Sequence, residues 1–140
     1  MNIENLYYNG GCKMSKFEWV SKKPLDELAT LYEANITLNK SATSYFETAY
    51  IVLLGLDVDN KLIAVKPITK EEASLGYVPE EQRHNITIKS SYSRVCNKLF
   101  MSEVAELMSF DFKNKNSYKF KAHWSKSEEA LIIDLNKEEV

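Results

Sequence analysis

The chain has 140 residues, of which 44% are hydrophobic and 27% are charged, and its net charge at neutral pH is −2. These values predict one soluble globular domain and exclude a general electrostatic attraction to nucleic acids or anionic membranes. The longest apolar run, Ala49 to Leu56, is too short to cross a bilayer. Cys12 and Cys96 form no spaced cluster, and residues 1–13 lack a signal-peptide pattern. We therefore expect a cytoplasmic protein without membrane contacts.

The first thirteen residues carry a separate hypothesis about where the protein starts. Gly10 and Gly11 can be encoded as GGAGG, a few nucleotides ahead of the Met14 codon, where a bacterial ribosome-binding site belongs. We therefore expect residues 1–13 to be translated leader and Met14 to be the native start. A genuine short N-terminal arm is the alternative. In either case we expect this segment to be disordered, with a single domain over residues 14–140.

Residues 16–31 fit two local structures. Pro24 is followed by Leu28 and Leu31, a spacing that suits a short helix with proline near its first turn. In contrast, Phe17 to Val20 begins with the alternation of apolar and polar residues that is typical of an edge strand. The local pattern alone leaves both structures open.

Residues 32–68 predict the order strand, helix, strand, turn and strand. Asn39 or Ser41 can cap the helix, and Asp57 to Asn60 form a hairpin turn. Ala49 to Leu56 is almost wholly apolar and predicts a strand buried on both faces. The expected elements are a strand over Asn35–Leu38, a helix over Ala42–Thr48, and strands over Ala49–Leu56 and Lys61–Ile68.

The same order returns in residues 86–136. Between the two units, residues 69–85 are acidic and contain Gly76 and Pro79, which predicts a connector with one weak helical turn. The clearest helix of the chain lies in the second unit, because its apolar residues recur at helical spacing. The expected elements are strands over Asn85–Ser90 and Ser93–Cys96, a helix over Leu99–Phe110 capped by Asn97 or Ser102, and strands over Tyr118–Trp124 and Ala130–Leu135.

The two units open on similar five-residue segments, Ile36 to Lys40 and Arg94 to Lys98. Each unit is too small to bury a core alone. We therefore expect an α+β fold in which two βαββ repeats, about 32–68 and 86–136, close one pseudo-symmetric, barrel-like domain. The residues expected in its single core are Leu38, Tyr45, Phe46, Val52, Leu54, Ile63, Val65, Val104, Leu107, Phe120, Trp124, Ile132 and Leu135.

The segment Ile36-Thr37-Leu38-Asn39-Lys40, the helix after it and the hairpin ending at Lys66-Pro67-Ile68 resemble the AbrB/SpoVT/MraZ group. Domains of that group open with Gly-Arg-Ile-Thr-Leu-Pro-Lys, and two units interlock through swapped β-hairpins. The resemblance covers residues 35–136 and implies a swapped-hairpin fold and a transcription regulator that binds DNA. Asn39 stands where the group has proline, and Asn35 stands where it has an arginine that helps contact DNA.

Catalytic, metal-binding and phosphate-cradling motifs are absent from the sequence. His84 and His123 have no Cys or carboxylate partner at ligand spacing, so we expect surface or edge histidines. Cys96 precedes a predicted helix, whose dipole can lower a thiol pKa, but burial as a small apolar residue is the preferred interpretation. We therefore expect no enzyme activity, no catalytic residue, no metal and no cofactor.

Basic residues gather in the second unit. Residues 86–126 contain eight Lys or Arg against three acids. Lys119 and Lys121 share one face of their predicted strand, while Arg94 and Lys98 flank the preceding turn. Arg94 is suited to bidentate base readout and the lysines to phosphate contacts, although a solvated strand surface is the alternative interpretation. The predicted nucleic-acid-binding residues are Arg94, Lys98, Lys113, Lys115, Lys119 and Lys121, with Tyr92 as a stacking residue.

These observations predict a non-enzymatic, transcription-regulator-like protein that binds DNA and forms a homo-oligomer. The alternative is a protein interaction or structural module that keeps the fold without binding DNA. Asn35 and the negative net charge favour the alternative, whereas the basic cluster favours DNA. The expected partner is accordingly DNA or another protein.

Overall fold

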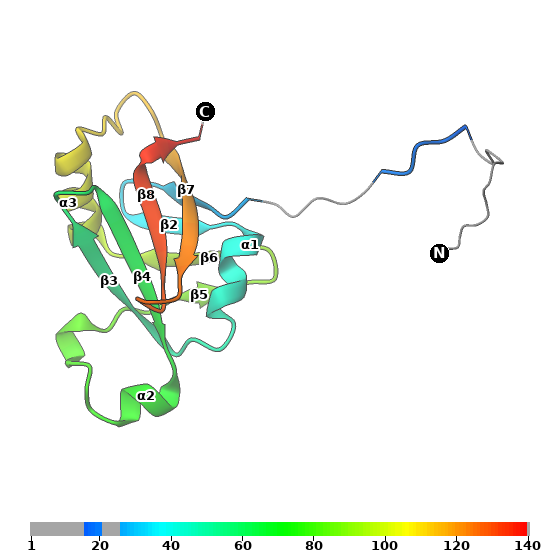
Figure 1. The fold of residues 1–140 in the computed structure, drawn as a ribbon. Helices are drawn as coiled ribbons and strands as arrows, with labels where there is room; N and C mark the ends of the chain where they lie inside the picture. Colours follow the sequence, from blue (N-terminus) through cyan, green and yellow to red (C-terminus); the bar gives the residue numbers. More distant parts are fainter. Residues whose placement is uncertain (1–15, 21–25, 140) are drawn as a thin grey trace, which may run out of the picture.

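The computed structural model describes residues 16–20 and 26–139, and this part of the chain forms an α+β fold around one eight-stranded antiparallel sheet. The sheet curls into a half-barrel with short helices around it (Figure 1). Residues 1–13, and with them the leader hypothesis, lie outside the described residues. The strands are β1 (Leu28–Leu31), β2 (Asn35–Leu38), β3 (Ile51–Asp57), β4 (Leu62–Ile68), β5 (Thr87–Ile88), β6 (Ser93–Cys96), β7 (Tyr118–Ser125) and β8 (Ala130–Glu138). The helices are α1 (Lys40–Thr43), η1 (Ser44–Phe46), α2 (Lys70–Ser74), η2 (Glu80–Gln82) and α3 (Lys98–Met108).

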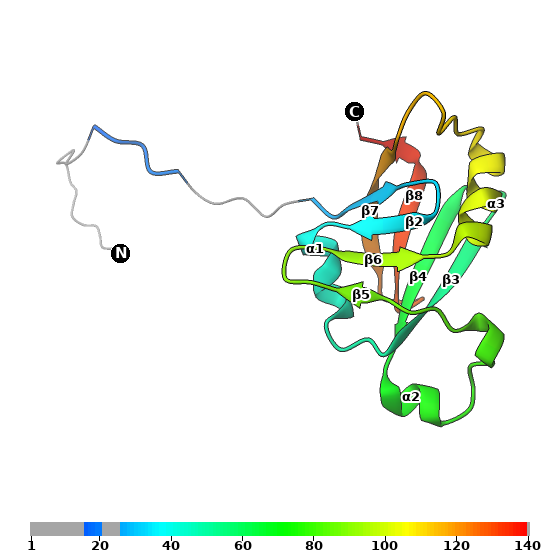
Figure 2. The ribbon, with the colours of Figure 1, turned by 180° about the vertical axis from the view of Figure 1, so that it is seen from behind.

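The strands follow the order β3-β4-β8-β7-β1-β2-β6-β5 across the sheet. Because the sheet curls, β3, β4 and β8 form one wall and β1, β2, β6 and β5 form the other, with β7 joining the two (Figures 1 and 2). One bridge joins the end strand β3 to the segment that precedes β5, the strand at the other end of the sheet. The backbone N–H of Val52 donates to the carbonyl of His84 at 2.9 Å, and the N–H of His84 donates back at 3.0 Å.

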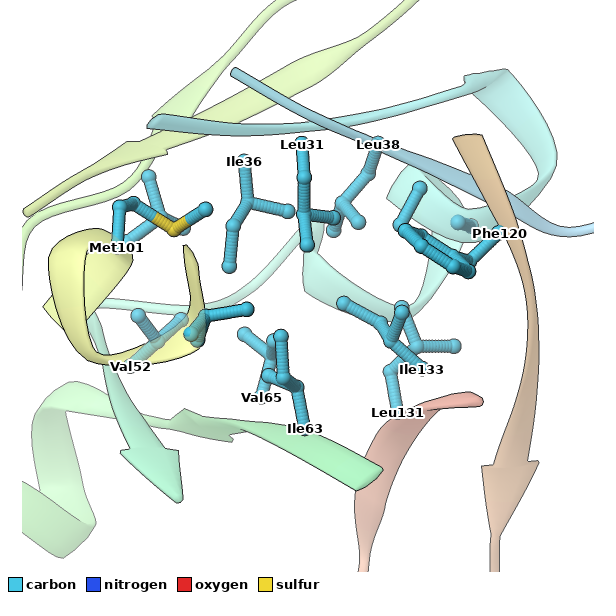
Figure 3. Close-up of a cluster of buried hydrophobic side chains, with 14 of the residues drawn as sticks. Leu31, Ile36, Leu38, Val52, Ile63, Val65, Met101, Phe120, Leu131 and Ile133 are labelled. Carbon is cyan, nitrogen blue, oxygen red and sulfur yellow. The ribbon is translucent and has the colours of Figure 1, made fainter. Parts of the chain in front are cut away.

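One large hydrophobic core lies between the two walls (Figure 3). Phe46 and Phe120, from different halves of the chain, are its largest fully buried side chains. A separate small cluster is formed by Ile51, Ile68 and Ala73. The expectation that both units contribute to one core is confirmed. Of the predicted core residues, Leu38, Phe46, Val52, Ile63, Val65, Val104, Phe120 and Leu135 are buried in it, and Tyr45, Leu54, Leu107 and Trp124 are half-buried against it. Ile132 is also buried but belongs to the outer face of β8, since its neighbours Leu131 and Ile133 face the core.

Asn39 joins the start of α1 to the segment around β1. Its Oδ1 accepts hydrogen bonds from the backbone N–H groups of Ala42 at 3.0 Å and Leu28 at 3.2 Å. Its Nδ2 donates to the carbonyl of Asp26 at 2.7 Å. The first bond satisfies an N–H that the first turn of a helix leaves unpaired, and the other two fix where β1 begins. Of the two predicted caps, Asn39 is thus the one used.

Asn97 has the matching position before α3. Its Oδ1 accepts from the N–H of Phe100 at 2.9 Å, and its Nδ2 lies 3.1 Å from Nδ1 of His84, in the segment before β5. The prediction of Asn97 rather than Ser102 as the cap is confirmed. The helix begins one residue before the predicted Leu99 and ends at Met108, because Ser109 adopts the left-handed conformation with φ of 56°.

The hairpin between β3 and β4 follows the predicted turn chemistry. Oδ1 of Asp57 accepts from the N–H of Asn60 at 3.0 Å, and Oδ2 accepts from Nδ2 of Asn60 at 2.8 Å. Both bonds lower the pKa of Asp57 below its usual range, and the bond from the side-chain amide of Asn60 contributes the larger part. Asx bonds of this kind fix the turn locally, so the prediction from Asp57 to Asn60 did not depend on tertiary context.

Of the two structures left open for residues 16–31, the helix is wrong where the structure describes it. Residues 28–31 form β1, which pairs with β2 on one side and β7 on the other. Ala29 and Leu31 are buried while Leu28 and Thr30 are half-buried, which is strand alternation. The leucine spacing also fits a helix, but backbone hydrogen bonds to both β2 and β7 make the strand the more stable structure here. Residues 21–25 lie outside the described part, and residues 17–20 form no strand.

Other elements differ from prediction in length or exposure. The first helix is α1 followed by the single turn η1, and β5 keeps only two residues of the predicted Asn85–Ser90. The prediction that Ala49–Leu56 is buried on both faces is wrong, because β3 is an end strand and is half-buried from Leu53 to Leu56. Strand β6 coincides with the predicted Ser93–Cys96, and β8 extends three residues past Leu135.

The sequence match between the two units is out of phase in the strands. Aligning Ile36 with Arg94 and Leu38 with Cys96 pairs buried residues with exposed ones. In the sheet, Ile36 instead lies opposite Val95, and both are buried. A shift of one residue moves every side chain to the other face, so the match does not equate the two strands face by face.

The core predicts a graded cost of truncation. Phe120→Ala is expected to lower the free energy of unfolding by about 3–5 kcal/mol, because the ring is fully buried. Leu107→Ala is expected to cost less than the roughly 2–5 kcal/mol of a fully buried leucine, because Leu107 is half-buried. Urea denaturation measures both, with exposed Leu99→Ala as the control. A Phe120→Ala cost equal to that of the control would contradict the core described above.

The two asparagine caps predict unequal losses. Asn97→Ala is expected to cost about 0.5–2 kcal/mol of unfolding free energy, the usual effect of removing an N-cap. Asn39→Ala should reach or exceed the upper end of that range, because its amide also binds Leu28 and Asp26. Exposed Asn85→Ala is the matched control. Equal midpoints for Asn39→Ala and Asn85→Ala in urea would rule out this role for Asn39.

Candidate nucleic-acid interface

A row of polar side chains crosses the outer face of β7 and of the wall formed by β1, β2, β6 and β5. Lys119 of β7 lies opposite Thr30 of β1, which lies opposite Thr37 of β2. Thr37 lies opposite Arg94 of β6, and Arg94 lies opposite Thr87 of β5. The residues before and after each of these positions are buried or half-buried, so all five side chains face outward. We call this set the cationic row.

Arg94 and Lys119 carry the two charges of the row. Strands β1 and β2 separate them, which places their Cα atoms about three strand spacings, or roughly 14 Å, apart. The hydroxyls of Thr30 and Thr37 lie between the two charges and can donate to an anion. Lys121 lies on the same face of β7, two residues beyond Lys119, and is also exposed. The face therefore presents three cations without an intervening carboxylate in the row.

Arg94 lies beside a shallow depression of about 400 Å³ lined by Tyr32, Asn35, Thr37, Tyr92 and Arg94. Its guanidinium lies 5.3 Å from the ring centre of Tyr92, a cation–π distance. The hydroxyl of Thr37 donates to Oδ1 of Asn35 at 3.0 Å. Among the described residues, no carboxylate lies within ion-pair distance of Arg94. The guanidinium is thus oriented by an aromatic ring and keeps its donors available.

The other three predicted basic residues lie elsewhere. Lys98 is the exposed first residue of α3, and Lys113 lies in the turn between α3 and β7. Lys115 is already engaged, because its Nζ lies 2.7 Å from Oε2 of Glu138 and 4.5 Å from the ring centre of Tyr118. The structure therefore brings together Arg94, Lys119 and Lys121, and not the full predicted set.

Sequence reasoning missed Thr30, Thr37 and Tyr32 as members of this face. Thr37 lies on the predicted strand β2, but its alignment with Arg94 depends on the pairing of β2 with β6. Thr30 and Tyr32 depend on β1, which was not predicted as a strand. The signal that could have found it was the alternation in Leu28-Ala29-Thr30-Leu31. The predicted face of β7 is confirmed, since Lys119, Lys121 and His123 are exposed, whereas Phe120 is buried.

Cys96 and His84 differ in how well they were anticipated. The expected burial of Cys96 is wrong: the thiol is exposed, because Ser93 and Val95 take the inward positions of β6. His84 is half-buried and belongs to the bridge with Val52, which agrees with an edge histidine. Its Nδ1 faces the amide of Asn97, as described above, so its surroundings are those of a structural contact.

Tyr45 and Glu27 form a second polar pair, near the start of β1. The hydroxyl of Tyr45 donates to the carboxylate of Glu27, and this bond raises the pKa of the phenol, with burial and the negative charge of Glu27 adding to it. The ring of Tyr45 also stacks on Trp124 at 4.7 Å between centres. This pair holds the chain before β1 against β7 and η1.

Within residues 16–20 and 26–139, no three His, Cys, Asp or Glu side chains are grouped so that they could hold a metal ion. The helices of the same residues include none with the length and apolar character needed to span a bilayer.

Comparison with protein-family models, with curated proteins and with solved structures found no match to this chain. The cationic row and its surroundings are therefore the features of the molecule that bear on its function.

Proposed function

We propose that this protein is a non-enzymatic, transcription-regulator-like protein that binds DNA through the outer face of β7, β1, β2, β6 and β5. The cationic row is the observation that carries the proposal. It places Arg94 and Lys119 at the two ends of a hydroxyl-lined path, with no carboxylate between them. Phosphates of a nucleic-acid backbone accept hydrogen bonds from all three kinds of side chain in this row.

The spacing in the row suits a phosphate backbone. Neighbouring phosphates of one strand lie roughly 7 Å apart through space, about twice their rise of 3.4 Å along the helix axis, so about 14 Å corresponds to roughly two steps. Arg94 differs from the lysines because its planar fork can bind the edge of a guanine with two hydrogen bonds. Its neighbour Tyr92 orients the fork from one side. We therefore assign base contact to Arg94 and phosphate contact to Lys119 and Lys121.

The proposal extends to the origin of the fold, as a divergent duplication of the AbrB/MraZ-like, swapped-hairpin type. Its support is that strand, helix, strand and strand occur twice in the element order. Asn39 and Asn97 cap the corresponding helices and bind the segments that precede β1 and β5. Corresponding strands pair with each other, β2 with β6 and β4 with β8. This arrangement is what two interlocked βαββ units would produce.

The alternative function is a protein interaction module that does not bind DNA. It is favoured by Asn35, which stands where the resembling group has its DNA-contacting arginine, and by the negative net charge. The scatter of Lys98, Lys113 and Lys115 outside the row favours it as well. Direct DNA titration separates the two functions.

If the row binds phosphates, Lys119→Ala should weaken binding to all duplexes and reduce the slope of log K against log salt by about one unit. Lys115→Ala is the matched control, because it removes the same charge from an ammonium already paired with Glu138. Fluorescence anisotropy with random duplexes at several salt concentrations measures both. No binding at low salt would support the interaction module, and equal losses for the two variants would place DNA binding outside the row.

Arg94→Ala should differ in kind from the lysine variants. Besides weakening binding, it should relax sequence preference by about 1–3 kcal/mol at one base position, the value of a good bidentate pair. Selection of enriched duplexes with the wild type, followed by titration of enriched and random duplexes, measures the preference. Arg94→Lys keeps the charge and serves as the control for the fork geometry. Unchanged preference in Arg94→Ala would remove Arg94 as the base reader.

A further inference from the structure

An apolar groove runs over the outer face of the other wall. Gly55 of β3 lies opposite Ala64 of β4, and Ala64 lies opposite Ile132 of β8, so these residues form its floor. Two adjoining hollows, of about 420 and 320 Å³, share Gly55, Ala64 and Glu128. Hollows of this size can receive large apolar side chains. We call this surface the β3–β4 groove.

Gly55 has no backbone reason to be glycine. Among the glycines of the described residues, Gly76 has positive φ and Gly55 does not. A Cβ atom placed on Gly55 would lie 3.7 Å from Cβ of Ala64, which is ordinary van der Waals contact. Glycine weakens the interior of a strand, and it often marks a point where another chain approaches closely. What the missing side chain provides here is the depth of the groove.

Residues 16–20 carry the apolar side chains that such a groove lacks. Trp19 is 81% exposed, Phe17 is 72% exposed and Val20 is 97% exposed. The rings of Phe17 and Trp19 lie 5.8 Å apart and so form one apolar surface. In Figures 1 and 2 this segment extends away from the sheet. Tryptophan is among the residues that most often anchor interfaces, and its exposure on a free chain is costly in water.

The segment around Trp19 and the β3–β4 groove carry opposite charges. Residues 13–23 contain four lysines and one glutamate. The groove is lined by Glu81 and Glu128, with Asp57 at its far end. Its one lysine, Lys66, donates to the carbonyl of Glu128 at 3.1 Å. Judged by sequence, a basic segment with aromatic side chains would complement an apolar floor with an acidic rim, and such complementarity favours association and fixes its direction.

We propose that residues 16–20 of one copy dock into the β3–β4 groove of a second copy, and that the exchange is reciprocal. Trp19 fills the hollow over Gly55 and Ala64, while Lys16 meets the acidic rim. A two-fold dimer of this kind contains two identical contacts, so each copy gives its segment and receives its partner's. The interface lies on the wall opposite the cationic row and does not depend on DNA binding.

Two variants test the two sides of the contact. Trp19→Ser removes the anchor, and Gly55→Val fills the floor at a position where an added Cβ atom makes only ordinary van der Waals contact. Each should weaken dimerisation by about tenfold or more in sedimentation equilibrium. Gly55→Val should unfold at the same or a higher temperature than the wild type, because β-branched residues favour strands. Tyr77→Ser, which removes an exposed aromatic side chain elsewhere, should leave dimerisation unchanged.

A mixture of the two variants shows whether the contact forms between copies. The Trp19→Ser chain keeps an intact groove, and the Gly55→Val chain keeps an intact segment. Mixed together they can form one of the two contacts, so the mixture should dimerise more tightly than either variant alone. A chain that carries both substitutions has neither the anchor nor an open groove. Mixed with either single variant it can form no complete contact, so these mixtures are the control.

Three results would overturn the proposal. A monomer at all concentrations with Trp19 protected from a fluorescence quencher, measured in a Trp124→Phe background, would show docking within one chain. A monomer with Trp19 fully accessible to the quencher would show no docking. A dimer unaffected by Trp19→Ser and by Gly55→Val would place the subunit interface elsewhere.

Discussion

Antiparallel pairing between distant strands is the constraint on which this molecule depends. β2 pairs with β6 and β4 pairs with β8, so the first and second halves of the chain share one core. A buried hydrogen bond of 2.8 Å between the hydroxyls of Thr43 and Ser93 joins α1 to β6 inside that core. A buried polar pair fits only one arrangement, so it specifies the register that apolar contacts alone would leave loose. The entropy of closing the long loops is repaid only after these pairs form.

Features that depend on a few neighbouring residues could be predicted from the sequence. Asn39 and Asn97 cap helices because their side chains reach N–H groups three residues away. Asp57 and Asn60 make a turn for the same local reason. The inward face of β7 was predictable because alternation over eight residues leaves little choice of phase. The groove has a weaker sequence signal, a glycine inside an apolar strand, whose meaning became clear only with the position of Ala64 opposite it.

Features that depend on cross-strand register could not be predicted in this way. β1 has four residues, and its leucines fit a helix equally well until β2 and β7 supply hydrogen-bond partners on both sides. In the four-residue strand β6, a shift of one residue exchanges Cys96 and Val95 between the two faces, which is why the burial of Cys96 was misjudged. The cationic row combines residues 30, 37, 87, 94 and 119, and only the sheet order aligns them.

The two outer surfaces of the sheet have opposite chemistry, and this separation bears on how the protein would act. The cationic row with the adjacent Lys121 presents three cations, Arg94, Lys119 and Lys121, which is a small number for a stable complex with DNA. A dimer joined through the β3–β4 groove would leave the row of each copy exposed, because the groove lies on the other wall. Two linked rows engage one duplex with a higher effective concentration than one, provided that both can reach it at once. Dimerisation would therefore supply the affinity that a single row lacks, and it would give the glycine at position 55 a role that offsets its cost to the strand.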